Sequence, residues 1–209
     1  MDILLEDIGK RYQRNWIFKN LSFQIESGDC IAITGINGSG KSTLLKIIST
    51  YIDPTQGEIK FSSKGSEIKS EEIPVRINYA APYVNLIEEL TLKEHLEFHS
   101  VFKNSILNLK EIAKLAGLEK AWNKTINVFS SGMKQRLKLA MAFYFTSDLI
   151  LLDEPTSNMD EQGIDWYLSE VQKIKTNQTV LIASNQRYEY DFSNKELKIS
   201  DYKKLKKAD

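Results

Sequence analysis

Short apolar or alternating runs fill the first third of the chain and predict β-strands, since alternation suits a half-buried sheet. Turn-forming glycines at Gly9 and Gly28 separate the first runs. The predicted strands cover residues 3–5, 17–25, 30–34, 57–61 and 76–80. After Thr34 comes a glycine-rich turn, and a helix is predicted from Lys41 to about Tyr51.

Residues 83–146 change to helical spacing. Thr91 and Asn108 each stand three residues before a glutamate, the pattern of a capping box that opens a helix. Gly117 offers a stop for the second of these helices. We therefore expect this part of the chain to be mostly helical.

Strand character returns at residues 149–152, and a β-rich run covers 179–184. The helix predicted between them places its apolar residues on one face: Ile164, Leu168, Val171 and Ile174. Strands alternating with helices around a helical insertion predict a parallel sheet with a lobe attached to it. The lysine-rich end is expected to be a solvated last helix, with Lys198, Lys203, Lys204, Lys206 and Lys207.

Composition narrows the class of protein. The 209 residues suit one domain, and 28 basic residues balance 28 acidic ones, which argues against a generally basic nucleic-acid binder. The single Cys30 excludes an intrachain disulfide framework and fits a reducing cytosol. Charged residues interrupt both the N-terminus and the apolar stretch 137–152, so we expect neither a signal peptide nor a membrane span.

The turn after Thr34 matches the phosphate-loop pattern G-x-x-x-x-G-K-[ST], with the sequence GINGSGKS ending at Ser42. Glycines 35, 38 and 40 leave room for consecutive backbone N–H groups to surround a triphosphate. The N-terminus of the following helix adds its dipole. In this interpretation Lys41 places a charge on the outer phosphates and the Ser42 hydroxyl ligates Mg²⁺.

Two carboxylates, Asp153 and Glu154, end the apolar run 149–152. Packing alone explains them poorly, because burying an unpaired charge is costly. Neighbouring strand residues point in different directions, so one acid can serve a metal and the other a water. Beside a phosphate loop, the favoured interpretation makes Asp153 the Mg²⁺ partner and Glu154 the base that polarises attacking water. The alternative is a purely structural strand end.

Just upstream of this strand, residues 129–136 read FSSGMKQR. This motif resembles the signature L-S-G-G-Q-x-Q-R of ABC-type ATPases, the nucleotide-binding subunits of ABC transporters. Phe129, Ser131 and Met133 are its three substitutions. Ser130 and Ser131 are good N-caps, and a helix N-terminus binds anions. The resemblance extends from about residue 2 to 190, and it implies that this helix start binds the γ-phosphate of ATP held by another protomer.

The resemblance implies an α/β fold: a P-loop NTPase (RecA-like) core sheet with an antiparallel β region and an inserted α-helical lobe. We expect one ATP-binding domain over 1–209, with its core lobe at about 1–82 and 147–209 and its helical lobe at about 83–146. The implied cofactors are ATP and Mg²⁺. The metal residues would be Ser42 and Asp153, and the catalytic residues Glu154, Lys41 and Asn185.

A larger set of residues is implied to bind the nucleotide. Within it, Tyr12 would stack on adenine, with Trp16 as the fallback, and Asp160 would span the dimer interface. The full set is Tyr12, Asn37, Gly38, Ser39, Gly40, Lys41, Ser42, Thr43, Ser130, Ser131, Gly132 and Asp160.

Two positions depart from the family pattern. The loop between the lobes, Ala81-Pro82-Tyr83, lacks the usual glutamine, although the Tyr83 hydroxyl offers one hydrogen bond. Asn185 stands where the family has a histidine after the last core strand, and an amide cannot become cationic. Both changes remove electrostatic help at the γ-phosphate, often worth about 3 kcal/mol per donor. Since Glu154 is retained, we expect slow hydrolysis.

The resemblance also implies partners. The competent unit would be a dimer, with an identical or a different second ABC ATPase protomer, that clamps around ATP and drives a separate transmembrane permease subunit. That subunit would rest near Pro82, Tyr83 and the helical lobe, which places the chain on the cytoplasmic face of the membrane. Two alternatives stay open: a soluble ABC-type ATPase for cofactor assembly, and a clamp that binds ATP with little turnover. His95 and His99 lie one helical turn apart without an apparent third metal ligand.

Overall fold

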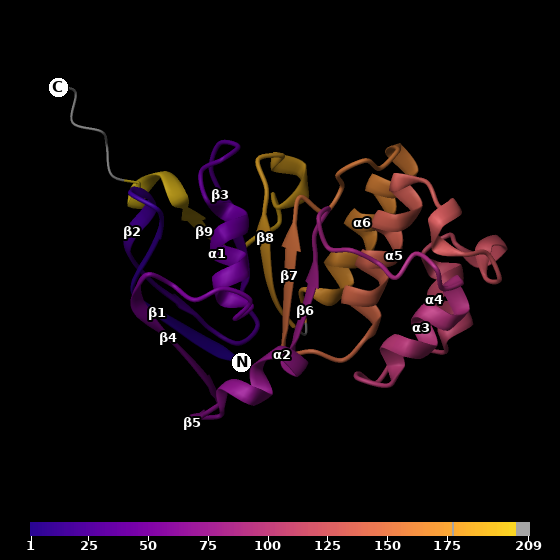
Figure 1. The fold of residues 1–209 in the computed structure, drawn as a ribbon, viewed down its shortest axis with the longest axis horizontal. Helices are drawn as coiled ribbons and strands as arrows, with labels where there is room; N and C mark the ends of the chain where they lie inside the picture. The colour runs from indigo at the N-terminus through magenta and orange to yellow at the C-terminus, as the bar shows by residue number, and fades with distance from the viewer. Residues whose placement is uncertain (177, 204–209) are drawn as a thin grey trace.

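Two β-sheets and a group of helices lie along the long axis of the molecule (Figure 1). The computed structural model describes residues 1–176 and 178–203. One sheet is antiparallel, in the order β2-β1-β4-β5, and contains β1 (Asp2–Tyr12), β2 (Asn15–Ile25), β4 (Gln56–Ser63) and β5 (Ser66–Glu67). The other is parallel, in the order β6-β7-β8-β3-β9, and contains β3 (Cys30–Thr34), β6 (Ile77–Ala80), β7 (Leu149–Asp153), β8 (Thr179–Ala183) and β9 (Lys195–Lys198).

The helices divide into two groups. Helix α1 (Lys41–Ile48) and the short α2 (Ile73–Arg76) belong to the half of the molecule that carries the antiparallel sheet, whereas the other described α-helices gather toward the opposite end (Figure 1). The second group contains α3 (Leu92–Ser100), α4 (Leu109–Leu115), α5 (Ser131–Tyr144) and α6 (Glu161–Ile174). Single 3₁₀ turns lie at Ser70–Glu72, Glu119–Ala121, Ile126–Val128, Arg187–Glu189 and Ile199–Tyr202.

The α/β fold with a parallel sheet, an antiparallel sheet and added helices is confirmed. The capping box at Thr91 is confirmed, because its side chain accepts from the Glu94 N–H. Asn108 also caps its helix, α4, but it accepts from the Lys110 N–H rather than from the expected Glu111 N–H. Gly117 ends α4 with φ +70°, and the next amide donates back to the Ala113 carbonyl at 2.7 Å. Between residues 83 and 146 the described helices alternate with loops and 3₁₀ turns.

Helix α1 ends at Ile48, short of the expected Tyr51. The chain turns at Thr50, which adopts φ 58° in the left-handed region. The Tyr51 N–H then donates back to the Lys46 carbonyl at 3.0 Å, a bond that closes the helix end.

One expectation about the C-terminal part was wrong. Lys198 does not begin a last helix, because it ends the edge strand β9; within the described residues the 3₁₀ turn Ile199–Tyr202 follows it. Lys204, Lys206 and Lys207 lie outside the described residues. The apolar face predicted for α6 packs on the core: Val171 is buried, and Leu168 and Ile174 are half-buried against the same cluster. Tyr167 and Glu170 are also buried, and Ile164 is half-buried.

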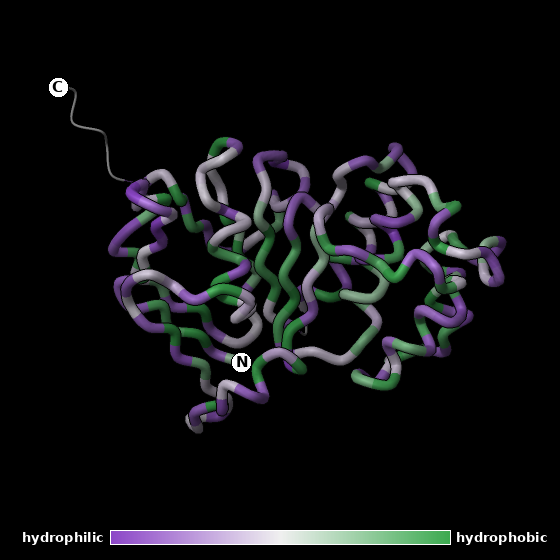
Figure 2. Tube along the Cα trace, in the orientation of Figure 1, coloured by the Kyte–Doolittle hydropathy of each residue, from purple (hydrophilic) through white to green (hydrophobic). Residues whose placement is uncertain are grey.

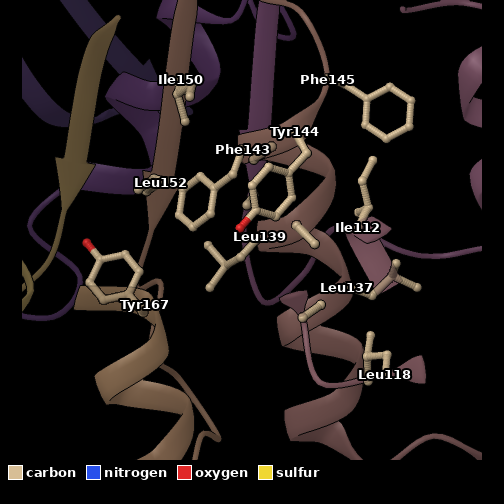
Figure 3. Packing of buried hydrophobic residues seen from close by; sticks show 14 of the residues in the cluster. Ile112, Leu118, Leu137, Leu139, Phe143, Tyr144, Phe145, Ile150, Leu152 and Tyr167 are labelled. Carbon is tan, nitrogen blue, oxygen red and sulfur yellow. The ribbon is translucent and has the colours of Figure 1, made fainter. Parts of the chain in front are cut away.

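The central strands carry the hydrophobic core on both faces of the parallel sheet, and Figure 2 shows the hydrophobic colouring concentrated there. Side chains alternate between two clusters: Leu149 and Leu151 face the antiparallel sheet and α1, while Ile150 and Leu152 face α5 and α6. Figure 3 shows the second cluster, in which Phe143 of α5 lies close to Tyr167 of α6, with ring centroids 6.4 Å apart. Because both faces are covered, polar groups of the central strands reach solvent at the strand ends.

Candidate functional site

The phosphate loop joins β3 to α1 at the carboxyl end of the parallel sheet (Figure 1). Two of its glycines are required by close packing. Gly40 caps α1 with φ 113°, and a Cβ there would lie 2.5 Å from Ile17 Cγ2. A Cβ on Gly35 would lie 2.6 Å from Ser39 Oγ. A Cβ on Gly38 would meet open space instead, so the loop is packed at its two ends and open at Gly38.

The loop contains buried polar groups that could bind an anion. Lys41 is 5% exposed, and its Nζ donates to the Gly35 carbonyl at 2.9 Å. Ser39 Oγ is buried and has no hydrogen-bond partner within the described chain. Ser42 and Thr43 open α1 and are half-buried, whereas residues 36–38 are exposed. An anion with several oxygens suits an ammonium group, a buried hydroxyl and the N-terminus of a helix.

The two acids lie where β7 ends: Asp153 is the last residue of the strand, and Glu154 follows it. Asp153 is 1% exposed; its Oδ2 accepts from the Tyr83 hydroxyl at 2.6 Å, while Oδ1 is buried without a partner in residues 1–176 and 178–203. Glu154 turns into the left-handed region at φ 44°, and its N–H donates to the Ala183 carbonyl at 2.9 Å. A buried carboxylate oxygen without a donor fits a hard cation or one of its bound waters.

Asn185 follows β8 and reaches the phosphate loop. Its Nδ2 donates to Asn37 Oδ1 at 3.1 Å, across a separation of 148 residues. The turn that carries it is fixed by Ser184, whose Oγ accepts from the Gln186 N–H at 2.8 Å. The structure therefore brings Asn185 beside the loop that holds Lys41. From the sequence, this position was predicted only by the resemblance to the family.

The motif 129–136 begins helix α5. Ser130 is its N-cap and accepts from the Met133 N–H at 3.2 Å, and both Ser130 and Ser131 are exposed. A Cβ on Gly132 would lie 3.0 Å from the Asn158 carbonyl oxygen, and Gln135 Nε2 donates to the Pro155 carbonyl at 2.9 Å. The motif is thus packed against the loop that follows the two acids, and its helix begins at an exposed position.

Asp160 has two partners in its own chain. Its Oδ1 caps α6 by accepting from the Gly163 N–H at 2.9 Å, and it pairs with Arg136 Nη2 at 2.7 Å. The hydrogen bond from Arg136, and next the backbone bond, hold the pKa of this exposed carboxyl below its ordinary value. That it also spans a dimer interface stays a prediction.

Tyr12 ends β1 and is 49% exposed, with Lys10 Nζ 5.3 Å from its ring centroid. The hairpin that carries it runs alongside the phosphate loop, because Ile17 of β2 lies against Gly40. Trp16 is half-buried, with Arg11 and Lys19 over its ring. Stacking on adenine stays a prediction for either ring, and Tyr12 is the more exposed of the two.

Sequence reasoning missed two groups next to the acids. Tyr79, on β6, shares a hydrogen bond between hydroxyls with Tyr83, and the one signal for it is the spacing of four residues. Glu189, in the 3₁₀ turn after β8, is buried and accepts at 2.9 Å from the Thr156 N–H, in the loop that follows Glu154. Burial raises the pKa of Glu189, whereas its hydrogen bonds from Ser184 and Thr156 oppose that rise. No local pattern signals this carboxyl.

The histidine pair lies away from this site, on α3, in the half of the molecule that holds α3 to α6. His95 is buried, and the His99 ring packs edge-on against Phe145 with centroids 4.5 Å apart. Burial, with Lys103 as a lesser cause, lowers the pKa of His99 to about 4. Among the described residues no group of three His, Cys, Asp or Glu side chains is placed to hold a metal ion. Within residues 1–176 and 178–203, no helix is long and apolar enough to cross a membrane.

Comparison with known proteins gives consistent matches. The family model described as "ABC transporter" matches residues 18–157. The uncharacterized ABC transporter ATP-binding protein YcbN of Bacillus subtilis (strain 168) is 32% identical over 180 residues, which are 84% of this chain and 59% of YcbN. The cytochrome c biogenesis ATP-binding export protein CcmA of Agrobacterium fabrum is 31% identical over 166 residues, 77% of each chain. The chain thus spans less than two thirds of the length of YcbN.

Solved structures match over nearly the whole chain. The dimeric post-hydrolysis structure of the ATP-binding cassette MJ0796, bound to ADP and Pi, has a TM-score of 0.82 at 25% identity and covers 94% of this chain and 93% of that chain. A putative ABC transporter ATP-binding protein from Pyrococcus furiosus has a TM-score of 0.79 at 24% identity, with 97% and 100% covered, and supports the fold alone.

Proposed function

This chain belongs to the ABC transporter family of ATP-binding proteins, and from that premise we propose that it binds ATP with Mg²⁺ and hydrolyses it to drive transport. The observation that carries the proposal is a pair of buried oxygen atoms, Ser39 Oγ and Asp153 Oδ1, which have no partners in the described chain. Ser39 lies in the loop after β3, and Asp153 ends β7 of the same sheet. A buried polar atom without a hydrogen bond costs about 1–3 kcal/mol. A nucleotide phosphate and its metal would satisfy both atoms.

Each group at the site has a proposed task. Lys41 neutralises the outer phosphates, Ser42 and Asp153 hold Mg²⁺, and Glu154 polarises the attacking water. Bound Mg²⁺ would supply charge neutralisation on the phosphate oxygens. Asn185 donates to the γ-phosphate without adding a positive charge, which supports slow turnover.

The site would be completed by a second protomer, identical or different. Residues 36–38 are exposed, and so are Ser130 and Ser131 at the start of α5. An exposed phosphate loop and an exposed helix N-terminus suit a pairing in which each chain covers the other's nucleotide. MJ0796, a similar cassette, has been solved as a dimer bound to ADP and Pi, which supports pairing with a second protomer.

A separate membrane subunit would rest on the loop Ala81-Pro82-Tyr83 and the helical lobe at about 83–146. A surface hollow of about 560 Å³ lies beside this loop, lined in part by Tyr51, Tyr83 and Val84. Exposed aromatic side chains there offer an amphipathic surface for a partner. The chain would then work at the cytoplasmic face of a membrane, with its core lobe at about 1–82 and 147–209.

Glu154→Gln tests the proposed function. Turnover of Mg-ATP should be abolished, and the variant should accumulate as an ATP-bound dimer, because it keeps the binding groups and loses the base. Phosphate release and size-exclusion chromatography with ATP measure the two effects. Glu161→Gln, an exposed acid at the start of α6, is the matched control and should behave as the parent. Equal turnover in parent and Glu154→Gln would contradict the assignment of Glu154.

A further inference from the structure

Tyr83 contacts three separate elements at the metal side of the site. Its hydroxyl donates to Asp153 Oδ2 at 2.6 Å, at the end of β7. The Tyr79 hydroxyl of β6 therefore acts as the donor in the bond between the two tyrosines. Lys46 of α1, the helix that follows the phosphate loop, places Nζ 4.2 Å from the centroid of the Tyr83 ring. A surface side chain with contacts to β6, β7 and α1 is held in one place.

We propose that Tyr83 is a positioning residue that orients the Asp153 carboxylate toward Mg²⁺ and links the metal site to the loop before α3. This inference rests on the proposed role of Asp153 as the metal partner. The hydroxyl occupies Oδ2, so the carboxylate presents Oδ1, the oxygen without a partner in the described chain, to a cation.

The energetics favour a positioning role over a passive contact. Asp153 is buried, and a hydrogen bond to a charged group generally stabilises it more than a bond between neutral groups does. Without the Tyr83 donor the carboxylate would keep only the neighbouring Tyr79 hydroxyl as a hydrogen-bonding group, and the side chain would lose its fixed orientation. A tyrosine hydroxyl is protonated at neutral pH, so Tyr83 can serve as this donor.

The loop that carries Tyr83 is in turn bound to α5. Lys138 Nζ donates to the Pro82 carbonyl at 2.7 Å and to the Ala81 carbonyl at 3.2 Å. A continuous set of contacts therefore runs from the helix that begins at Ser131, through this loop, to Asp153.

Tyr83→Phe tests the proposal, because it removes the hydroxyl and keeps the ring over which Lys46 lies. We would measure ATP affinity by calorimetry in EDTA and over a series of Mg²⁺ concentrations. The variant should need about tenfold more Mg²⁺ for half of the metal-dependent gain in affinity, the effect of losing one charge-assisted hydrogen bond. Its ATP affinity in EDTA and its melting temperature should match those of the parent.

Two further variants separate the possible failures. Tyr51→Phe removes the hydroxyl of a tyrosine that is 77% exposed, and it should leave the Mg²⁺ requirement unchanged. Asp153→Asn should remove most of the Mg²⁺ dependence. If Asp153→Asn has that effect and Tyr83→Phe has none, the positioning role is wrong. If Asp153→Asn itself leaves the Mg²⁺ dependence intact, the proposed metal site is wrong.

Discussion

A methyl group added at position 40 tests how the phosphate loop is supported. Gly40 has φ 113° and ψ 8°, a conformation that side chains rarely adopt. An alanine Cβ would also lie 2.5 Å from Ile17 Cγ2 and 3.1 Å from Phe18 Cδ1. The Ile17 methyl belongs to a stiff β-branched side chain, so it cannot rotate away freely. Gly40→Ala therefore combines backbone strain with overpacking.

The loss of stability expected for Gly40→Ala can be worked out by comparison with a second glycine, Gly28. Gly28 has φ 92°, and a Cβ there meets nothing within 4 Å, so Gly28→Ala measures strain alone, about 1–2 kcal/mol. Overpacking adds about 2 kcal/mol in Gly40→Ala. For a domain of this size each kcal/mol lowers the melting temperature by about 2–4 °C. The midpoint of Gly40→Ala should thus lie about 4–8 °C below that of Gly28→Ala.

Thermal unfolding followed by circular dichroism, without nucleotide, measures this difference. Equal melting temperatures for the two variants would refute the reasoning, since they would mean that Ile17 and Phe18 do not confine the loop. A Gly28→Ala variant less stable than Gly40→Ala would refute it as well.

Two other substitutions test groups beside the site. Asn185→His should raise ATP turnover by about tenfold, because the longer histidine ring can become cationic. This gain is part of the roughly 10²–10³-fold in rate that one donor contributes. An unchanged rate in a phosphate-release assay would contradict this prediction. Glu189→Gln should become increasingly more stable than the parent as the pH rises. Burial raises the pKa of Glu189, so its contribution to stability is complete below about pH 4.5 and declines as the pH rises through the higher folded value. Urea unfolding at pH 5 and pH 8 measures the difference, and a gap independent of pH would count against it.

The sequence predicted the parts of the site that are local. The phosphate loop, the two acids after an apolar strand and the capped start of α5 each occupy a few consecutive residues, and all lie on the expected elements. The edge strand β9 was missed because only Leu197 of its four residues is buried, which leaves no apolar run to detect. On α6 the predicted apolar face is joined by the buried Tyr167, whose hydroxyl donates to the Glu189 carbonyl at 2.8 Å, a contact that no local pattern signals.

Sequence alone therefore determined which residues carry charge and which segments fold into most of the strands and helices, because periodicity and capping act over a few residues. Tertiary structure decided which groups meet. Tyr83 and Asp153 are 70 residues apart, and Asn185 and Asn37 are 148 apart. Their contacts depend on the order of strands in the parallel sheet, which brings distant strand ends to one edge. The order of these strands cannot be predicted from any local sequence pattern.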